Sequence, residues 1–493
     1  MTTTGKTFLA TLIIASLLLF GACVKNYSGG GFSSTQGGYY NNPVVGNTDS
    51  IVETPFIKTI DSATSTFSID ADGGSYALAR KIVNSGTSSI GAYKDAIRTE
   101  EFINYFTYNY PDPANGENMA VNGEVSTCPW NNDNKLIRIG LKGQSVAVNN
   151  YPFANFVLLI DVSGSMSDPD KLKLLKEGFI LFAQQMRPQD RIAIVVYAGA
   201  DRVVLPSTPG TQKSTIINAM SNLGPGGSTN GAAGIKKAYE IAQSNFITGG
   251  NNRIILGTDG DFNVGITSTD ELVKLIEEKR NSGVYLTTLG VGMGNYNESM
   301  MEKLANKGNG NYEYLDSKEE LKKVFINEYN KFITVAKDVK IQVTFNKELV
   351  EEYRLIGYEN RVLRTNDFQD DSKDAGEIGA GQTITAIYEI KPKATANFKT
   401  VPSFAIHFRY KKPGENISLP IDLDIYDAGN SFNEASENMR FAASLAALGM
   451  YLRNSQYKGN VTIQTIRSWA SSATTFDPFG YRSNHLAILQ KIN

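Results

Sequence analysis

The chain has 493 residues, 41% of them apolar and 20% charged, a composition typical of a globular protein with roughly two to four domains. Its 48 basic and 50 acidic residues nearly cancel, which excludes a strong attraction to nucleic acid or to an anionic membrane surface. Two histidines, His407 and His485, lie far apart and outside any zinc hydrolase motif. Two cysteines, Cys23 and Cys128, provide no internal disulfide framework if Cys23 is used in processing.

Residues 1–23 have the pattern of an export signal, with Lys6 followed by the apolar run Phe8–Phe20 and then small residues. The segment that ends in Gly21-Ala22-Cys23 resembles the bacterial lipoprotein box, which implies that Cys23 becomes the lipidated first residue. A plain signal peptide and a membrane anchor are the alternatives. Cys128 is then a lone thiol, which we expect to be buried.

Residues 24–61 are rich in Gly, Ser, Asn, Thr and Tyr and lack periodicity, so we interpret them as a flexible tether between membrane and folded body. No acidic cluster follows Cys23, and this favours a position in the cell envelope facing the periplasm.

Periodic sequence begins with an alternating strand pattern at Ser65–Asp70. We assign residues 62–148 to an N-terminal α+β domain, with helices at Ser75–Asn84 and Asp95–Phe106 and strands at Met119–Val125 and Lys135–Leu141.

Residues 149–335 alternate between strand and helix patterns, which predicts an α/β domain with a doubly wound, mostly parallel sheet. Such sheets bind ligands beyond the carboxyl ends of their strands. The predicted strands are Phe156–Ile160, Arg191–Tyr197, Arg202–Leu205, Arg253–Gly257, Val284–Val291 and Tyr312–Leu315. The predicted helices are Lys171–Met186, Thr211–Asn222, Asn230–Asn245, Thr269–Asn281, Asn297–Lys307 and Glu319–Val335.

Oxygen-bearing side chains follow the first of these strands. Asp161, Ser163 and Ser165 alternate along a tight turn, and oxygen ligands suit a hard cation such as Mg²⁺ or Ca²⁺. An ordinary loop with helix-capping residues is the alternative. Two further loops at the same edge add the hydroxyl of Thr229 and the carboxylate of Asp259, which singly would be a cap and a turn residue. Together, the three loops predict one metal site.

The set formed by Asp161-x-Ser163-x-Ser165, Thr229 and Asp259 resembles the complete metal-ion-dependent adhesion site of the von Willebrand factor type A fold. The resemblance implies that the three hydroxyls contact Mg²⁺ (or Ca²⁺ or Mn²⁺) and that the two aspartates act directly or through water. Asp261 has no counterpart in the motif and is interpreted as a turn residue.

The flanking regions resemble those of one group of bacterial envelope proteins. In the N-terminal domain the resemblance lies in Thr66–Tyr76, Arg98–Phe106, Tyr108–Pro111 and Cys128–Asn131. Residues 336–493 resemble the C-terminal domain of unknown function in the same group. Their patterns predict antiparallel strands at Val339–Phe345, Thr383–Ile390 and Phe404–Tyr410, then helices at Ser431–Arg453 and Val461–Ala470. We expect the strands on both sides of the central domain to pack into one β-rich α+β body.

The predicted site favours binding over catalysis. Three neutral hydroxyls neutralise little of the charge of a metal ion, which leaves it free to bind an Asp or Glu of a protein partner. No histidine precedes His407, and no convincing general base or nucleophile accompanies the site. We therefore expect a lipid-anchored envelope protein that is not an enzyme. The alternatives are a metal-assisted hydrolase, a structural scaffold, or a channel component; after Cys23 no apolar run approaches the roughly 18 residues of a membrane span.

Overall fold

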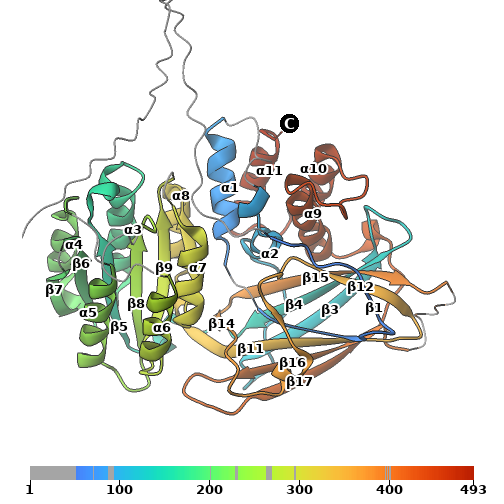
Figure 1. Ribbon diagram of the computed structural model, residues 1–493, viewed down its shortest axis with the longest axis horizontal. Helices are drawn as coiled ribbons and strands as arrows, with labels where there is room; N and C mark the ends of the chain where they lie inside the picture. Colours follow the sequence, from blue (N-terminus) through green and yellow to red (C-terminus); the bar gives the residue numbers. More distant parts are fainter. Residues whose placement is uncertain are drawn as a thin grey trace, which may run out of the picture. The chain divides into compact units, whose positions relative to one another are not determined.

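The computed structural model describes residues 51–492 except 70–71, 87–93, 200, 228–230, 262–268, 294–295, 395, 397 and 399–400. Two predicted site residues, Cys23 and Thr229, lie outside the described residues. Figure 1 shows one helix-flanked sheet formed by the middle of the chain, and two further sheets to which both the early and the late parts contribute. We call them the central domain and the β-body.

The sheet of the central domain has the strand order β10-β9-β8-β5-β6-β7. Neighbouring strands are parallel from β10 to β6, and β7 is antiparallel to β6. The predicted doubly wound, mostly parallel sheet is therefore confirmed. Its strands are β5 Ala154–Asp161, β6 Arg191–Tyr197, β7 Asp201–Pro209, β8 Asn251–Thr258, β9 Tyr285–Val291 and β10 Tyr312–Leu315.

Alternate side chains of β5 enter two different cores, because successive residues of a strand point to opposite faces of a sheet. Phe156 and Leu158 pack in the core shared with α3 (Leu172–Gln185), α4 (Lys213–Ser221) and α8 (Lys318–Lys322). Val157 and Leu159 pack in the core shared with α5 (Gly231–Ser244), α6 (Thr269–Arg280) and α7 (Glu298–Lys307). Full burial of each such side chain stabilises the fold by roughly 1.5–3 kcal/mol, so the strand that carries Asp161 is firmly held.

The β-body consists of two antiparallel sheets with strand orders β1-β12-β15-β4-β3 and β13-β2-β11-β16-β17, and β14 pairs with β11. Strands from the two ends of the chain pair directly, since β4 lies beside β15 and β2 lies beside β11. The expected composite body is therefore confirmed. Its strands are β1 Ile57–Lys58, β2 Thr64–Ser68, β3 Met119–Thr127, β4 Lys135–Gly143, β11 Thr334–Phe345, β12 Val350–Ile356, β13 Val362–Leu363, β14 Gly376–Gly379, β15 Thr383–Pro392, β16 Phe404–Lys411 and β17 Leu419–Ile425.

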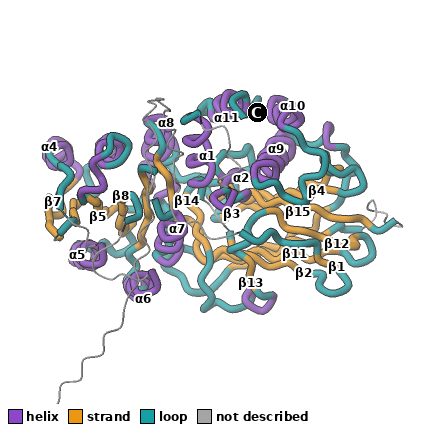
Figure 2. The backbone as a smooth tube through the Cα atoms, turned by 45° about the horizontal axis from the view of Figure 1, so that its top comes forward, coloured by secondary structure: helices purple, strands orange, loops and turns teal. Residues whose placement is uncertain are grey.

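Helices from both ends of the chain lie together over the β-body in both ribbon and tube views (Figures 1 and 2). They share one core with residues of β4, β12 and β15, and α2 and α9 contact β15 directly. Cys128 is a buried free thiol in this core, as expected. These helices are α1 Gly74–Asn84, α2 Thr99–Asn104, α9 Glu437–Leu452, α10 Ile463–Ser471 and α11 Tyr481–Leu489.

Three predicted helices are too long; the one predicted at Ser431–Arg453 begins only at Glu437, as α9. The helix predicted at Glu319–Val335 ends at Lys322, continues as a π-helical turn to Asn327 and a 3-10 turn over Tyr329–Phe332, and gives way to β11 at Thr334. The β-branched run Ile333-Thr334-Val335 favours a strand, and the pairing of β11 with three other strands decides the outcome. Similarly, α2 covers only part of Asp95–Phe106.

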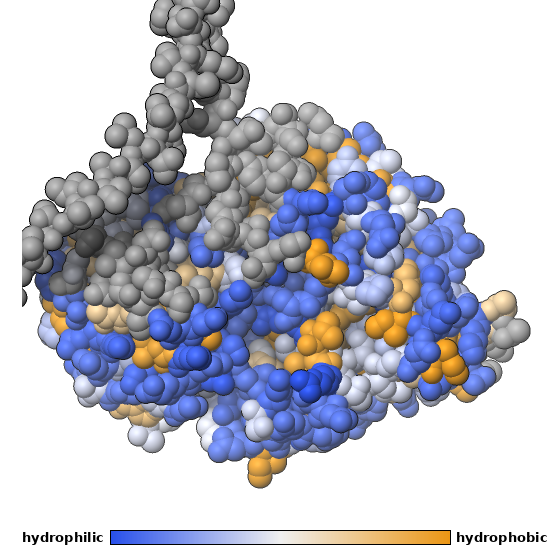
Figure 3. Space-filling view, in the orientation of Figure 1, coloured by the Kyte–Doolittle hydropathy of each residue, from blue (hydrophilic) through white to orange (hydrophobic). Residues whose placement is uncertain are grey.

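Apolar side chains on the described surface are dispersed. The face in Figure 3 is largely hydrophilic, with small separate apolar patches. Exposed apolar residues such as Val148, Val362 and Ile417 come from different elements, which is normal for a folded protein. Among the described helices, none is both long and apolar enough to cross a membrane.

Candidate metal site

Asp161 ends β5, and three neutral groups fix its carboxylate. Its Oδ1 accepts a hydrogen bond from the Ser163 backbone N–H at 2.9 Å. Its Oδ2 accepts from the Thr258 hydroxyl at 2.9 Å and from the Tyr197 hydroxyl at 3.2 Å. Thr258 and Tyr197 end the two strands on either side of β5, so the sheet itself orients the carboxylate.

The hydroxyls of Ser163 and Ser165 lie side by side, with 3.0 Å between their Oγ atoms. Ser163 is extended, and a 3-10 turn over Gly164–Ser167 brings the second hydroxyl back beside the first. From typical bond lengths, neighbouring oxygens around an octahedral Mg²⁺ are about 2.9 Å apart, against about 3.5 Å around Ca²⁺. The observed 3.0 Å is also the length of a hydrogen bond between the two hydroxyls, so the spacing is compatible with Mg²⁺ but does not select it.

Asp259 follows β8 and is fully buried. Its Oδ1 accepts a hydrogen bond from the Asp261 backbone N–H at 3.3 Å, and its Oδ2 accepts one from the Lys171 ammonium at 2.9 Å. The backbone of Asp261 thus closes the turn around Asp259, in line with its interpretation as a turn residue. Thr258, the residue before Asp259, donates to the Asp161 carboxylate, so the loops that carry the two aspartates meet at this hydrogen bond.

The Asp161 carboxyl is fully buried. Burial raises its pKa to about 6, and the negative charge of Asp259 acts in the same direction, while the hydrogen bonds from Ser163 and Thr258 oppose the shift. Neutral donors therefore do not fully compensate the buried charge. A cation held by the residues of this site would compensate it, and this is the chemistry expected of a metal-ligating aspartate.

A glycine loop lies beside the two serines. The Gly226 N–H donates to the Val162 carbonyl at 2.7 Å, and the Gly164 N–H donates to the Gly227 carbonyl at 3.0 Å. Gly227 has a φ of 97°, a conformation that strongly favours glycine. These bonds hold the loop that leads to Thr229 against the serine turn, although Thr229 itself lies outside the described residues.

Sequence reasoning missed three residues that touch the predicted ligands, namely Lys171, Tyr197 and Thr258. Thr258 directly precedes Asp259, and Tyr197 is the last residue of a predicted strand, so each lies at the expected edge of the sheet. Lys171 immediately precedes α3. A positive charge is unfavourable at a helix N-terminus. A lysine at this position therefore indicates that a nearby carboxylate compensates its charge, and this signal could have identified Lys171 from the sequence.

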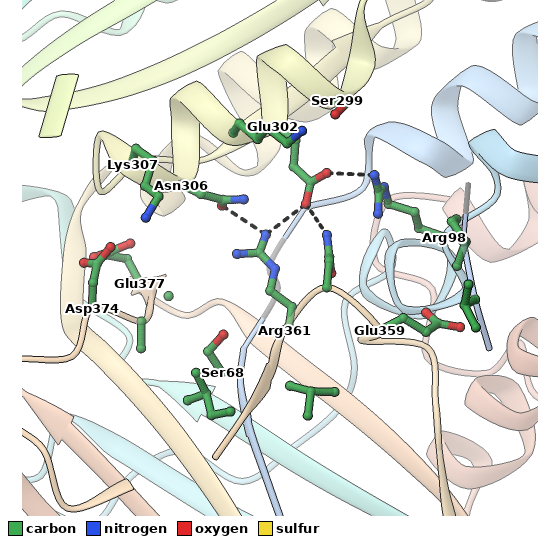
Figure 4. A pocket seen from close by; sticks show the side chains of 18 residues that line it. Ser68, Arg98, Ser299, Glu302, Asn306, Lys307, Glu359, Arg361, Asp374 and Glu377 are labelled. Carbon is green, nitrogen blue, oxygen red and sulfur yellow. Dashed lines mark hydrogen bonds and ion pairs between the residues drawn. The ribbon is translucent and has the colours of Figure 1, made fainter. Parts of the chain in front are cut away.

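A charged cavity of about 490 Å³ lies between α7 of the central domain and the β-body (Figure 4). Four of its polar residues bond to one another. Glu302 on α7 accepts hydrogen bonds from Asn360 at 2.6 Å and Arg361 at 3.4 Å, and forms an ion pair with Arg98 at 3.1 Å. We call Arg98, Glu302, Asn360 and Arg361 the interface cluster, because it joins the central domain to the β-body.

A groove of about 500 Å³ on the outer face of β16 and β17 contains a histidine–carboxylate pair. His407 Nδ1 lies 2.7 Å from Asp422 Oδ1. Ser418 lines the same groove, but its hydroxyl donates to Asp371 at 2.6 Å. A serine nucleophile paired with a histidine base is therefore not assembled there.

Comparison with known proteins identifies the family. Residues 155–327 match the von Willebrand factor type A domain, residues 46–138 match the family described as von Willebrand factor, and residues 330–493 match the C-terminal domain of uncharacterised protein YfbK. Uncharacterised protein YfbK of Escherichia coli K12 is 39% identical over 474 residues, which cover 91% of this chain and 81% of the relative. The chain belongs to the YfbK family of von Willebrand factor type A proteins.

Two further matches to the YfbK-family chain have lower sequence identity. A UPF0353 protein of Mycolicibacterium paratuberculosis is 27% identical over 150 residues, which cover 28% of this chain and 45% of the relative. Among solved structures, a von Willebrand factor type A protein from Catenulispora acidiphila is 15% identical. It aligns with 78% of this chain and 91% of its own, at a TM-score of 0.45. A type A domain is consistent with a role in protein interaction or adhesion.

Proposed function

We propose that this YfbK-family protein binds an acidic side chain of a protein partner through a divalent cation held by Asp161, Ser163, Ser165, Thr229 and Asp259. The observation that supports this most directly is the pair of adjacent serine hydroxyls at the same sheet edge as two buried carboxylates. Mn²⁺ and Ca²⁺ are the alternative cations. A bound cation would supply the positive charge that an Asp or Glu of the partner recognises.

The protein's own groups have separate tasks in this proposal. The serine hydroxyls provide neutral oxygens, which add no negative charge to that of the two aspartates. Thr258 and Tyr197 hold the Asp161 carboxylate in one orientation, and Lys171 holds that of Asp259. Side chains fixed in this way are pre-organised, and this lowers the entropic cost of binding. The protein is proposed to bind rather than to catalyse.

The proposed location is the bacterial cell envelope, facing the periplasm, with a lipid anchor on Cys23 and no nucleic acid partner. The export pattern of residues 1–23 and the near balance of 48 basic and 50 acidic residues support it. Cell fractionation tests the anchor. The protein is expected to sediment with membranes and to be released by detergent but not by high salt; release by salt alone would contradict a lipid anchor.

The metal site is tested by titrating Mg²⁺ into the full-length protein in a calorimeter. Asp161→Ala is expected to lower the Mg²⁺ affinity by at least about 100-fold while the far-UV circular dichroism stays unchanged, because the variant removes one of the two anionic ligands. Asp201→Ala is the matched control, since Asp201 is exposed and pairs with Tyr197 at the same edge of the sheet. An unchanged affinity in Asp161→Ala would contradict the proposed site.

Partner binding is tested by crosslinking in an envelope extract with Mg²⁺ or with a chelator. The proposal expects one or more crosslinked proteins to be lost on chelation and in Asp161→Ala, and to be retained in Asp201→Ala. Crosslinks that persist in the presence of the chelator would mean that the partner does not contact a metal.

A further inference from the structure

One positive charge of the chain itself lies in the candidate metal site. Lys171 is only 4% exposed. Its ammonium donates to Asp259 Oδ2 at 2.9 Å and to the Ser165 carbonyl at 3.0 Å, and it lies 3.8 Å from Asp168. It therefore contacts two of the loops that carry predicted metal ligands.

The surroundings of Lys171 are shaped to keep it there. Its aliphatic chain lies against Gly292, where an added Cβ would be 2.5 Å from the Lys171 Cε. The Tyr314 hydroxyl donates to the Gly292 carbonyl and fixes this backbone. The neighbouring Asp170 is held by Lys81 of α1 at 2.6 Å. Lys171 is therefore a buried side chain that the surrounding residues hold in the site.

The charges of the site can be counted from these contacts. Asp161 and Asp259 are the carboxylates of the predicted ligand set, and the ammonium of Lys171 contacts the second of them. Asp168 also lies near the ammonium, but 69% of its side chain is exposed, so solvent screens its charge and it is left out of the count. Together the three buried groups carry a net charge of about −1 when ionised. A divalent cation held there would keep a net charge of about +1. Without the lysine, the same two carboxylates would neutralise the cation completely.

We propose that Lys171 is a positioning residue that holds Asp259 and weakens the binding of the divalent cation, so that positive charge remains for the acidic side chain of the partner. This inference rests on the proposed function and adds to it. It makes the cation and the partner mutually dependent: each binds the site better when the other is present, as linkage between the two ligands requires. Lys171 then makes the site selective for an anionic partner over a neutral one.

Three substitutions separate the charge of Lys171 from its hydrogen bonds. Lys171→Met removes both at similar length, Lys171→Gln keeps a donor without charge, and Lys171→Arg keeps the charge. Calorimetric titration of Mg²⁺ into the full-length protein should show roughly tenfold tighter binding for the Met and Gln variants, because a nearby like charge is removed. The Arg variant should stay within about twofold of the wild type.

Lys176→Met is the matched control, since Lys176 is on the same helix and donates to the carbonyls of Ser221 and Leu223 instead. Circular dichroism checks that each variant is folded. Unchanged or weaker Mg²⁺ binding in both the Met and Gln variants would overturn the inference while leaving the proposed site intact. Absence of Mg²⁺ binding in the wild type and in every variant would overturn both the inference and the proposed function. Mg²⁺ binding that is detected in the Met and Gln variants but not in the wild type would support the inference.

Discussion

The candidate metal site and the interface cluster both bury carboxylates, but they treat the negative charge differently. In the interface cluster, two guanidinium groups flank Glu302, and they neutralise its charge within the protein. In the metal site, the Asp161 carboxylate accepts hydrogen bonds from an amide and from hydroxyl groups, and its pKa is raised to about 6. Burial also raises the pKa of Glu298, beside the interface cluster, to about 7, so a raised pKa alone does not distinguish the two sites. The metal site differs because its carboxylates and hydroxyls come from loops at the carboxyl edge of a parallel sheet, where such sheets bind ligands.

The largest effect is expected from a substitution in the interface cluster. Arg98→Met leaves Glu302 buried without one of its two guanidinium partners and also removes the positive charge nearest to Glu298. We expect the free energy of unfolding to fall by about 3–5 kcal/mol, the usual cost of removing one partner of a buried ion pair. Urea denaturation measures this loss.

The Mg²⁺ affinity of the Arg98→Met variant should stay within about twofold of the wild type if the interface cluster and the metal site are independent. Arg202→Met, at an exposed position of β7, controls for the loss of one positive charge. A loss of less than about 1 kcal/mol in the Arg98 variant would show that the cluster does not hold the two parts of the molecule together.

A smaller effect is expected from His485, which is buried without any opposing charge. Its Nδ1 lies 2.8 Å from the Tyr76 hydroxyl, and burial lowers its pKa from 6.5 to about 3. The unfolded chain therefore takes up a proton below about pH 6.5 that the folded chain does not, so stability is lost as the pH falls from 6.5 towards 3.

His485→Gln keeps a hydrogen-bonding partner for Tyr76 and cannot take up this proton. Between about pH 6 and pH 4 the wild type should lose up to roughly 1.4 kcal/mol per pH unit relative to this variant. Melting temperatures recorded across this range give the difference. Parallel curves for the two proteins would mean that His485 is protonated in the folded state.

The smallest effect is expected at the contact between α1 and the loop of the metal site. Lys81 and Asp170 are 2.6 Å apart, but 43% of the Asp170 side chain is exposed to solvent. Lys81→Met should cost at most about 1 kcal/mol of stability and change the Mg²⁺ affinity by less than about twofold. A tenfold change in affinity, measured by calorimetry, would instead show that α1 acts on the metal site.

The sequence predicted those parts of the site that depend on local patterns. Five apolar residues followed by Asp161-x-Ser163-x-Ser165 define a buried strand and the turn after it, and Asp259 follows a second such strand. Parallel strands place their carboxyl ends at one edge, so the proximity of these side chains follows from the fold class alone. The structure puts Asp161, Ser163, Ser165 and Asp259 at that edge.

Contacts that depend on tertiary packing could not be predicted. Lys171 reaches Asp259 only because Gly292 leaves room for its side chain, and Tyr197 reaches Asp161 from a neighbouring strand. The same limit explains the error at Glu319–Val335. The apolar spacing there suits a helix, but Thr334 and Val335 are drawn into β11 by pairing with distant strands.

The insertion of the central domain between β4 and β11 has a consequence for how the chain folds during synthesis. Every strand partner within the central domain is contributed by residues 154–315, so this domain has all its sheet contacts before the C-terminal region is made. By contrast, β2 has to wait for β11, and the inner edge of β4 has to wait for β15. Unpaired strand edges promote aggregation, and long-range pairing is slow. We therefore expect the early strands β2 and β4 to be the part of the chain most prone to aggregate until the last third of the chain has been synthesised.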